Sequence, residues 1–159
     1  FLIDKEQIKV EVDFAGQRYP VQIPTGSTAQ SFVPHPIGEV AIYQGDEIEV
    51  PLIEIAHARS GDKGNHSNIG VIARKIEYLP WIRAALTEAN IADYMQHVLD
   101  PETSKVIRYE LPAMNALNFM LENALGGGGI ASLRIDPQGK AFAQQLLDMP
   151  VKVPRKLIS

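Results

Sequence analysis

The order in which strand-like and helix-like patterns follow one another after Pro51 limits the folds open to this chain more than any other feature. The segment PLIEIAHA, which begins at Pro51, reads as a strand, and the glycine-containing loop RSGDKGNHS joins it to a second strand, NIGVIAR. Apolar residues then recur alternately with helical spacing and with strand spacing. The chain therefore runs strand, strand, helices, strand, helix, strand, helix.

The later elements are predicted from this spacing and from the residues that end each pattern. Residues 77–87 carry an apolar helical stripe, Asn90 can cap a further helix that ends before Pro101, and residues 105–111 alternate as a strand. Residues 112–125 are expected to form a helix stopped by the glycines at 126–129, and residues 130–135 a strand. Asp136-Pro137 is expected to begin a last helix that reaches about Leu147. About four strands whose helices share one face predict an α+β fold, a two-layer sandwich of the ferredoxin-like kind.

The first 50 residues have a different character. Residues 8–14 and 18–23 alternate around Ala15-Gly16-Gln17, which predicts a short β-hairpin, and the Pro, Gly, Ser and Thr content of residues 24–38 predicts a linker. We therefore divide the chain into a hairpin and linker (1–50), the ferredoxin-like domain (51–150) and a loose tail (151–159). Because Phe1 is not an initiator methionine, we expect a fragment of a larger protein, with residues 1–50 ending an upstream domain.

Composition narrows the partners that the chain can bind. A formal net charge of -4 and the absence of any run of Lys or Arg disfavour binding to nucleic acid or to an anionic membrane. No apolar stretch approaches the roughly 18 residues of a membrane span, no signal peptide is evident, and we expect a cytoplasmic protein. The chain has no cysteine, which excludes disulfides, thiolate nucleophiles and cysteine metal sites. Small molecules or other proteins are the expected partners.

The loop at residues 58–65, ARSGDKGN, is the most promising place for chemistry. Its glycines and polar side chains follow a strand directly, so its backbone N–H groups could face an anion while Arg59 or Lys63 neutralises the charge. The spacing does not match a Walker loop. A polar turn whose Asp62 and Lys63 merely face water is the alternative interpretation.

Strand alternation suggests a second group of polar residues. If helices cover one face of the sheet, the polar sides of the strands share the other, and that set would comprise Glu54, Arg74, Arg108, Glu110, Ser132 and Arg134. Arginines gathered there could bind a carboxylate or phosphate in bidentate fashion, with a carboxylate as general base. The alternative is a set of surface ion pairs, each worth about 0–1 kcal/mol.

A few single residues carry further hypotheses. Asn118 lies on the apolar stripe of the helix expected at 112–125, where it could brace the glycine loop or contact a ligand. For His57 we favour a core histidine, whereas His66, within the loop, is the better candidate for proton transfer. The glycines at 126–129 read as a helix cap and turn, with close approach of a ligand as the alternative. The histidine spacing specifies no metal site, and no cofactor is indicated.

Three ordered segments, AHARSGDKGNHSNIGVIAR (56–74), RYELPAMNALNFMLENALGGG (108–128) and SLRIDPQGK (132–140), resemble the C-terminal domain of the acyclic terpene utilisation (AtuA-like) protein family. The resemblance implies a small ferredoxin-like domain that usually follows a much longer N-terminal domain. It also implies a bacterial catabolic protein concerned with branched acyl-CoA intermediates, without specifying the reaction or the catalytic residues.

Two functions follow as hypotheses. In the first, the chain is the C-terminal part of an enzyme with hydratase, isomerase or lyase chemistry on a branched acyl-CoA or related carboxylate. Its candidate catalytic residues are Asp62, Lys63 and His66, and its candidate ligand-binding residues are Arg59, Ser60, Asn65, Asn68, Arg108, Asn118 and Arg134. In the second, the chain is a non-catalytic module that forms a homo-oligomer or docks on the upstream domain.

Overall fold

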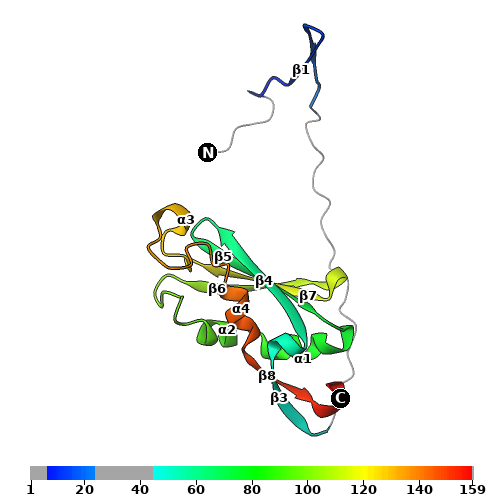
Figure 1. Ribbon diagram of the computed structural model, residues 1–159, viewed down its shortest axis with the longest axis vertical. Helices are drawn as coiled ribbons and strands as arrows, with labels where there is room; N and C mark the ends of the chain where they lie inside the picture. Colours follow the sequence, from blue (N-terminus) through cyan, green and yellow to red (C-terminus); the bar gives the residue numbers. More distant parts are fainter. Residues whose placement is uncertain (1–6, 24–44, 159) are drawn as a thin grey trace. The chain divides into compact units, whose positions relative to one another are not determined.

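The computed structural model describes residues 7–23 and 45–158, and the chain divides into two compact units, residues 1–35 and 36–159. In the first unit, β1 (Glu11–Phe14) pairs antiparallel with β2 (Gln17–Pro20) (Figure 1). Ala15 and Gly16 join them at positive φ values of 54° and 80°, as a type I′ turn requires. The predicted hairpin is confirmed, while the linker expected at 24–38 lies outside the described residues.

The second unit is built on a four-stranded antiparallel sheet. Its strands are β4 (Ala56–Lys63), β5 (His66–Ala73), β6 (Lys105–Leu111) and β7 (Ala116–Glu122), in the spatial order β4-β5-β7-β6. On each strand every second side chain faces the core, among them Ile69 on β5, Leu117 and Phe119 on β7 and Val106 on β6. β4 and β6 are the edge strands of this sheet.

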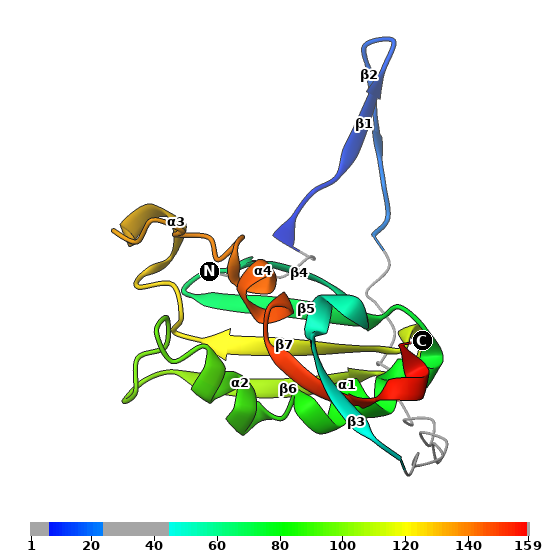
Figure 2. The ribbon, with the colours of Figure 1, turned by 60° about the horizontal axis from the view of Figure 1, so that its bottom comes forward.

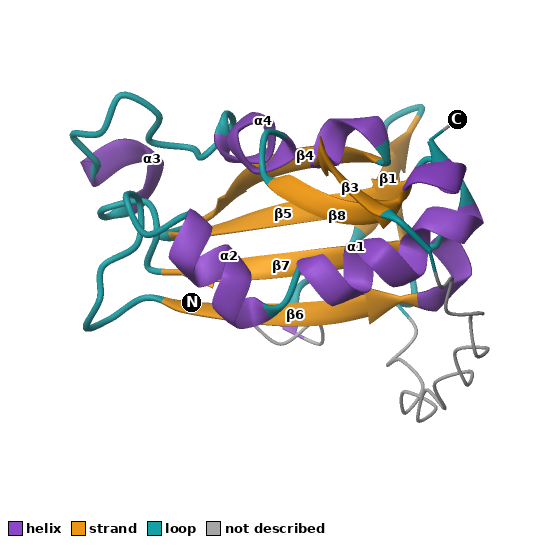
Figure 3. Ribbon diagram, turned by 90° about the horizontal axis from the view of Figure 1, so that it is seen from below, coloured by secondary structure: helices purple, strands orange, loops and turns teal. Residues whose placement is uncertain are grey.

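Helices cover one face of this sheet. Figure 3 shows α1 (Leu79–Ala85), α2 (Glu88–Tyr94) and α4 (Phe142–Leu147) on the same side of the strands. A two-stranded ribbon of β3 (Glu47–Pro51) and β8 (Pro150–Pro154) crosses that side (Figure 2). Short 3-10 turns occur at 52–54, 76–78, 112–114 and 155–157, and α3 (Gly128–Ala131) is a single turn. The predicted α+β class and its two-layer arrangement are confirmed.

The helix expected at 112–125 is wrong, because this segment forms β7. Leu117 and Leu121 fit a helical stripe, but Phe119 between them completes an alternation with a period of two. All three side chains are fully buried. Residues 105–122 therefore form two paired strands joined by a tight connection, in which Asn115 adopts a positive φ of 50°.

The strand expected at 130–135 is also wrong. Residues 128–131 form α3, residues 132–135 form no strand, and the exposed fractions of Ile130, Leu133 and Ile135 are 105%, 102% and 105%. The last helix begins at Phe142 instead of near Asp136, because Gly139 adopts a φ of 60°. Asp136 still satisfies backbone donors ahead of the helix, since its carboxylate accepts hydrogen bonds from the N–H groups of residues 140 and 141.

Two further expectations need correction. The tail is not loose at its start, because β8 pairs with β3 and its Val151 and Val153 are buried in the core. The second helix begins at Glu88, and its cap is Thr87, whose Oγ1 accepts a hydrogen bond from the N–H of Asn90 at 3.1 Å. Across the described residues, no helix is both long and apolar enough to cross a bilayer.

Candidate functional site

The segment expected as a loop at 59–67 is a β-hairpin. β4 and β5 pair without interruption from Ala56 opposite Ala73 to Lys63 opposite His66, and only Gly64 and Asn65 form the turn. Gly64 has a φ of 67°, which suits the first position of a two-residue turn. The polar composition of the segment reflects the open edge and open face of the sheet, and not an irregular loop.

Pairing distributes the predicted residues over both faces of the sheet. Arg59 and Lys63 alternate with Ser60 and Asp62 along β4, so the first two lie on the face without helices and the other two on the helix side. Asn68, on β5, lies on the open face too, because it pairs with Gly61 of β4, which lies on the same face as Arg59 and Lys63. The hairpin therefore presents candidate residues on both sides of the edge strand β4.

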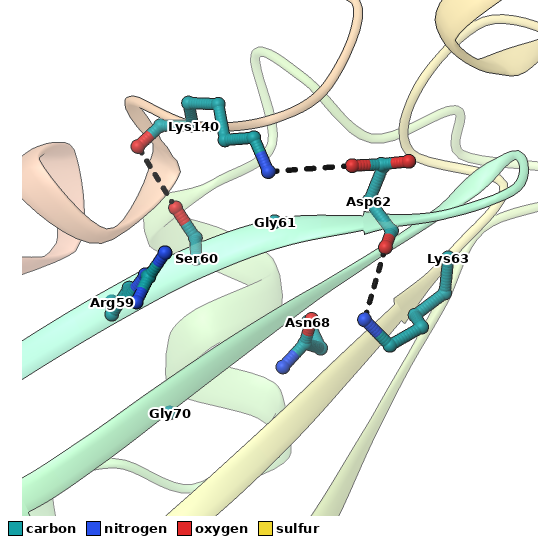
Figure 4. Close-up of a pocket in the computed structure, with 8 residues that line it drawn as sticks. All are labelled: Arg59, Ser60, Gly61, Asp62, Lys63, Asn68, Gly70 and Lys140. Atoms are coloured by element: carbon teal, nitrogen blue, oxygen red, sulfur yellow. Dashed lines mark hydrogen bonds and ion pairs between the residues drawn. The ribbon is translucent and has the colours of Figure 1, made fainter.

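A cleft of about 440 Å³ lies along this part of β4. Figure 4 shows its lining: Arg59, Ser60, Gly61, Asp62, Lys63, Asn68, Gly70 and Lys140. Five of the predicted site residues meet here. Lys140, just before α4, was not predicted, although it ends one of the segments that carry the family resemblance.

Lys140 reaches Asp62 across the edge strand. Its Nζ lies 3.4 Å from Asp62 Oδ1, and a Cβ added to Gly61 would lie 3.1 Å from that nitrogen. Buried Ser60 holds this arrangement, because its Oγ donates to the carbonyl of Lys140 at 3.1 Å and accepts from the N–H of Ala143 at 2.9 Å. Ser60 therefore positions the start of α4.

The pKa of Asp62 lies below its ordinary value. The main cause is a hydrogen bond from its own backbone N–H, followed by the side chain of Lys140 and then by the charges of Lys140 and Lys63. At neutral pH Asp62 is therefore an ionised carboxylate and a weak base.

The open face next to this ion pair carries cations and amides. Arg59 is exposed, and within the described residues it makes no hydrogen bond or ion pair. It lies opposite Gly70, which in turn lies opposite Asn118. Asn68 Nδ2 donates to Asn118 Oδ1 at 3.2 Å. Because Gly70 has no side chain, the surface between Arg59 and the two amides is left open.

Asn65 and His66 brace the hairpin turn. Asn65 Oδ1 accepts from the N–H of Gly127 at 2.6 Å, and its Nδ2 donates to Asn123 Oδ1 at 3.2 Å. His66 Nδ1 accepts from the N–H of Asn123 at 2.9 Å. Because a backbone N–H can only donate, Nδ1 of His66 is not free to take a proton from a substrate. Asn118, which we considered as a brace for this glycine-containing segment, contacts the hairpin at Asn68, whereas Asn65 and His66 make the contacts at its turn.

The remaining arginines do not reach this site. Arg108 lies on the helix-covered face, where its Nη1 donates to the carbonyls of Arg83 and Leu86 and its Nη2 lies 3.3 Å from Glu110 Oε1. Arg134 donates to the carbonyls of Val98 and Ala124. The polar residues expected to share one open face therefore do not lie together. These two arginines instead stabilise helices and loops through hydrogen bonds to backbone carbonyls.

The two other single-residue hypotheses also change. His57 is exposed on the open face opposite Ile72, so the core position that we favoured is wrong. Asn118 belongs to a strand and not to a helical stripe, and Gly70 is a further residue of the cleft that was not among the predicted site residues. Within residues 7–23 and 45–158, no three His, Asp or Glu side chains gather in a way that could hold a metal ion.

The fold and the site together define a class of protein. It is a two-layer α+β domain whose edge hairpin places cations and amides around a shallow cleft. Residues 50–152, more than half of the chain, match the family model for the AtuA ferredoxin-like domain, and the chain belongs to this family. The resemblance and the ferredoxin-like fold predicted from the sequence are thereby confirmed. No curated protein and no solved structure matches the chain.

Proposed function

We propose that this chain is the anion-binding domain of an AtuA-type catabolic enzyme, and that it holds the carboxylate or phosphate of a branched acyl-CoA or related acid at the β4–β5 cleft. The observation that carries the proposal is an excess of cations around one cleft. Arg59, Lys63 and Lys140 line it, and Asp62 is the one carboxylate among its lining residues.

Each cation can contribute in a distinct way. Arg59 is exposed and unpaired among the described residues, so its planar guanidinium can form two parallel hydrogen bonds to a carboxylate or phosphate. Among the residues that the structure describes, Lys63 Nζ donates to the neighbouring carbonyl of Asp62 alone, at 3.0 Å, and keeps two further N–H bonds for a ligand. Lys140 is held by Asp62 and would supply charge from the helix side.

The amide pair supplies neutral recognition. With Asn68 Nδ2 bonded to Asn118 Oδ1, the Nδ2 group of Asn118 remains available as a donor on the open face. Gly70 lies between Arg59 and Asn118 and leaves space for a ligand against the backbone. These neighbours would orient the anionic group that the cations attract.

Binding is better supported than proton transfer. Asp62 is the carboxylate of the cleft, but its lowered pKa makes it a weak base, and Nδ1 of His66 is engaged with Asn123. If hydratase, isomerase or lyase chemistry occurs here, Asp62 would be the proton acceptor, and Asp62→Asn would abolish turnover while binding remains.

The test is a calorimetric titration of this chain with short branched acyl-CoAs, the free branched acids and CoA. We expect Arg59→Gln to weaken binding about 10- to 100-fold, because a charge-assisted hydrogen bond contributes about 1.5–3 kcal/mol. Lys63→Met should weaken it less. Lys152→Met is the matched control, because Lys152 is exposed on β8, outside the cleft.

Gly70→Ala tests the position of the ligand without removing charge. The added Cβ would meet only the carbonyl oxygen of Arg59, at an ordinary 3.8 Å, so the fold should tolerate it while the open surface is partly filled. Gly45→Ala is its control, since a Cβ there meets nothing within 4 Å. Titrations that remain unchanged in Arg59→Gln and Gly70→Ala would refute the proposed site.

A second function, docking or dimerisation through the open face of the sheet, is favoured by one observation. Ile72, Tyr109 and Leu111 lie on that face with exposed fractions of 39%, 47% and 37%. If no titrated anion binds and Tyr109→Ser abolishes self-association or binding of this chain to the rest of the protein, this second function replaces the first.

A further inference from the structure

The N-terminal hairpin has one face that is almost entirely apolar. The pairing of Val12 with Tyr19 and of Phe14 with Gln17 places the even residues of β1 and the odd residues of β2 on the same side. Outside the strands, the N–H of Val21 donates to the carbonyl of Val10, which continues this register. The apolar members of this face, with exposed fractions from 38% to 71%, are Ile8, Val10, Val12, Phe14, Tyr19, Val21 and Ile23.

The opposite face of the hairpin is polar and has its own charge partners. Arg18 lies 3.9 Å from Glu11 and 3.7 Å from Asp13. With Lys9, the hairpin carries two positive and two negative side chains, so its net charge is zero. A hairpin without excess charge has no electrostatic preference for nucleic acid, for an anionic membrane or for a charged protein surface.

Two strands cannot bury such a face by themselves. An isolated two-stranded hairpin is at best marginally stable in water, and it becomes stable when its apolar face packs against another layer. Each side chain of this size contributes about 1.5–3 kcal/mol when it is fully buried. The apolar face is therefore built to be covered.

We propose that a second copy of this chain covers it, so that two hairpins pack face to face about a two-fold axis. A two-fold contact requires a surface that complements itself. Phe14 and Tyr19 lie toward the turn, whereas Ile8 and Ile23 lie at the open end. In an antiparallel face-to-face arrangement, the aromatic end of each hairpin meets the β-branched end of the other, so that side chains from the two inner faces interdigitate.

Charge and size are consistent with this partner. Two neutral hairpins do not repel each other, although the chain as a whole has a net charge of -4. Each hairpin brings only eight residues to the contact, fewer than the roughly 20–30 per side of a standard interface, so we expect a dimer with a dissociation constant in the micromolar range. This self-association does not depend on the anion site proposed above.

Sedimentation equilibrium of the full chain over a wide concentration range tests the proposal. We expect a reversible monomer–dimer equilibrium that Val12→Glu weakens at least about tenfold, because it places a charge in the apolar contact. Gln22→Glu introduces the same charge on the polar face and should leave the equilibrium unchanged.

The absence of cysteine provides a second test that does not depend on how Val12→Glu folds. A single cysteine in Val12→Cys lies near the middle of the apolar face, where an antiparallel two-fold contact brings the two copies of the residue together, and one in Gln22→Cys lies on the polar face. Under mild oxidation we expect the first variant to form disulfide-linked dimers at least about tenfold faster, since a preformed contact raises the local thiol concentration.

Three results would overturn the proposal. These are a chain that stays monomeric at hundreds of micromolar, equal crosslinking of the two cysteine variants, and a dimer insensitive to Val12→Glu. Binding of a monomeric chain to neutral phosphatidylcholine vesicles, with loss in Val12→Glu, would also overturn it and assign the face to a lipid surface.

Discussion

At the scale of single residues, the ion pair between Lys140 and Asp62 connects the edge strand of the sheet to the segment before α4. The pair is partly exposed, with side-chain exposed fractions of 58% and 38%, so solvent screens it and its direct contribution to stability is small. Its main effect is electrostatic. After the larger effect of the backbone hydrogen bond, it lowers the pKa of Asp62 further, and it keeps the charge of Lys140 at the cleft.

The first prediction concerns the pKa of Asp62. In Lys140→Met we expect this pKa to rise toward its ordinary value but to remain below it, because the hydrogen bond from the backbone N–H of Asp62, the larger cause, is retained. Carbon-detected NMR titration of the Asp62 carboxyl measures this directly. In Lys152→Met the pKa should stay at its wild-type value.

The sign of the accompanying pH dependence of stability follows from linkage. Because the folded-state pKa of Asp62 is lowered, its contribution is present above the unfolded value of about 3.9 and is lost as the pH falls through the folded value. The loss of stability below about pH 4 should therefore be shallower in Asp62→Asn. An unchanged Asp62 titration in Lys140→Met would show that the pair does not form in solution.

At the scale of secondary-structure elements, the turn between β4 and β5 depends on the glycine run that follows β7. The N–H of Leu125 donates to the carbonyl of Asn65 at 3.1 Å, and the N–H of Gly127 donates a hydrogen bond to the side-chain oxygen of Asn65. Gly128, at a φ of 81°, lies so close that a Cβ there would be 2.6 Å from the carbonyl oxygen of Gly64. The glycines therefore serve close backbone approach between two segments of this chain.

We predict that Gly128→Ala lowers the free energy of unfolding by about 1–3 kcal/mol, because the new Cβ clashes with backbone and L side chains disfavour this φ. Urea denaturation measures the change. Gly129→Ala is the matched control, since its Cβ would meet only the side chain of Gln138, at 3.7 Å. Equal stabilities of the two variants would mean that the contact with Gly64 does not exist.

At the scale of the whole molecule, the β3–β8 ribbon joins residues near position 50 to the end of the chain and closes the core over the helices. Leu52, Val151 and Val153 are buried with exposed fractions of 0%, 1% and 0%, and they belong to the same core as Phe119 and Phe142. The second unit is therefore complete only when residues 150–154 are in place.

We predict that Val153→Thr, which nearly preserves volume but buries a hydroxyl, destabilises the second unit by about 1–3 kcal/mol. Lys152→Thr, one position earlier on the exposed side of β8, should change stability by less than about 0.5 kcal/mol. Thermal unfolding followed by circular dichroism distinguishes the variants. If Val153→Thr unfolds like the wild type, β8 does not contribute to the core.

Several parts of the fold could be predicted because their signals are local. The hairpin at 8–23, the strand at 105–111 and the helix around Trp81 each have one dominant period of apolar residues. Residues 112–125 fit both a helix and a strand, since Leu117 and Leu121 are four apart while Phe119 lies between them. Pairing of β7 with β5 and β6 decided between these periods, and its partners on β5 lie more than 40 positions earlier in the chain.

Some residues of the candidate site could likewise be predicted from local signals, and others could not. The residues of the cleft on β4 and β5, from Arg59 to Asn68, were predictable because glycine and polar side chains cluster next to a strand. Lys140 was not predictable, because the fold brings it to Asp62 across 78 positions of sequence. Arg108 and Arg134 were assigned to the site on alternation alone, but their neighbours on α1 and in the loops bind them instead.

By itself, then, the sequence determined the class of fold, the family, and which segment holds the polar residues of the site. The tertiary structure alone decided which side of the sheet each side chain faces, which cations remain unpaired and which glycines meet another backbone. The physical reason is that periodicity, turns and composition are carried by neighbours along the chain. The face a residue occupies and the partner it finds are set by register and packing between distant segments.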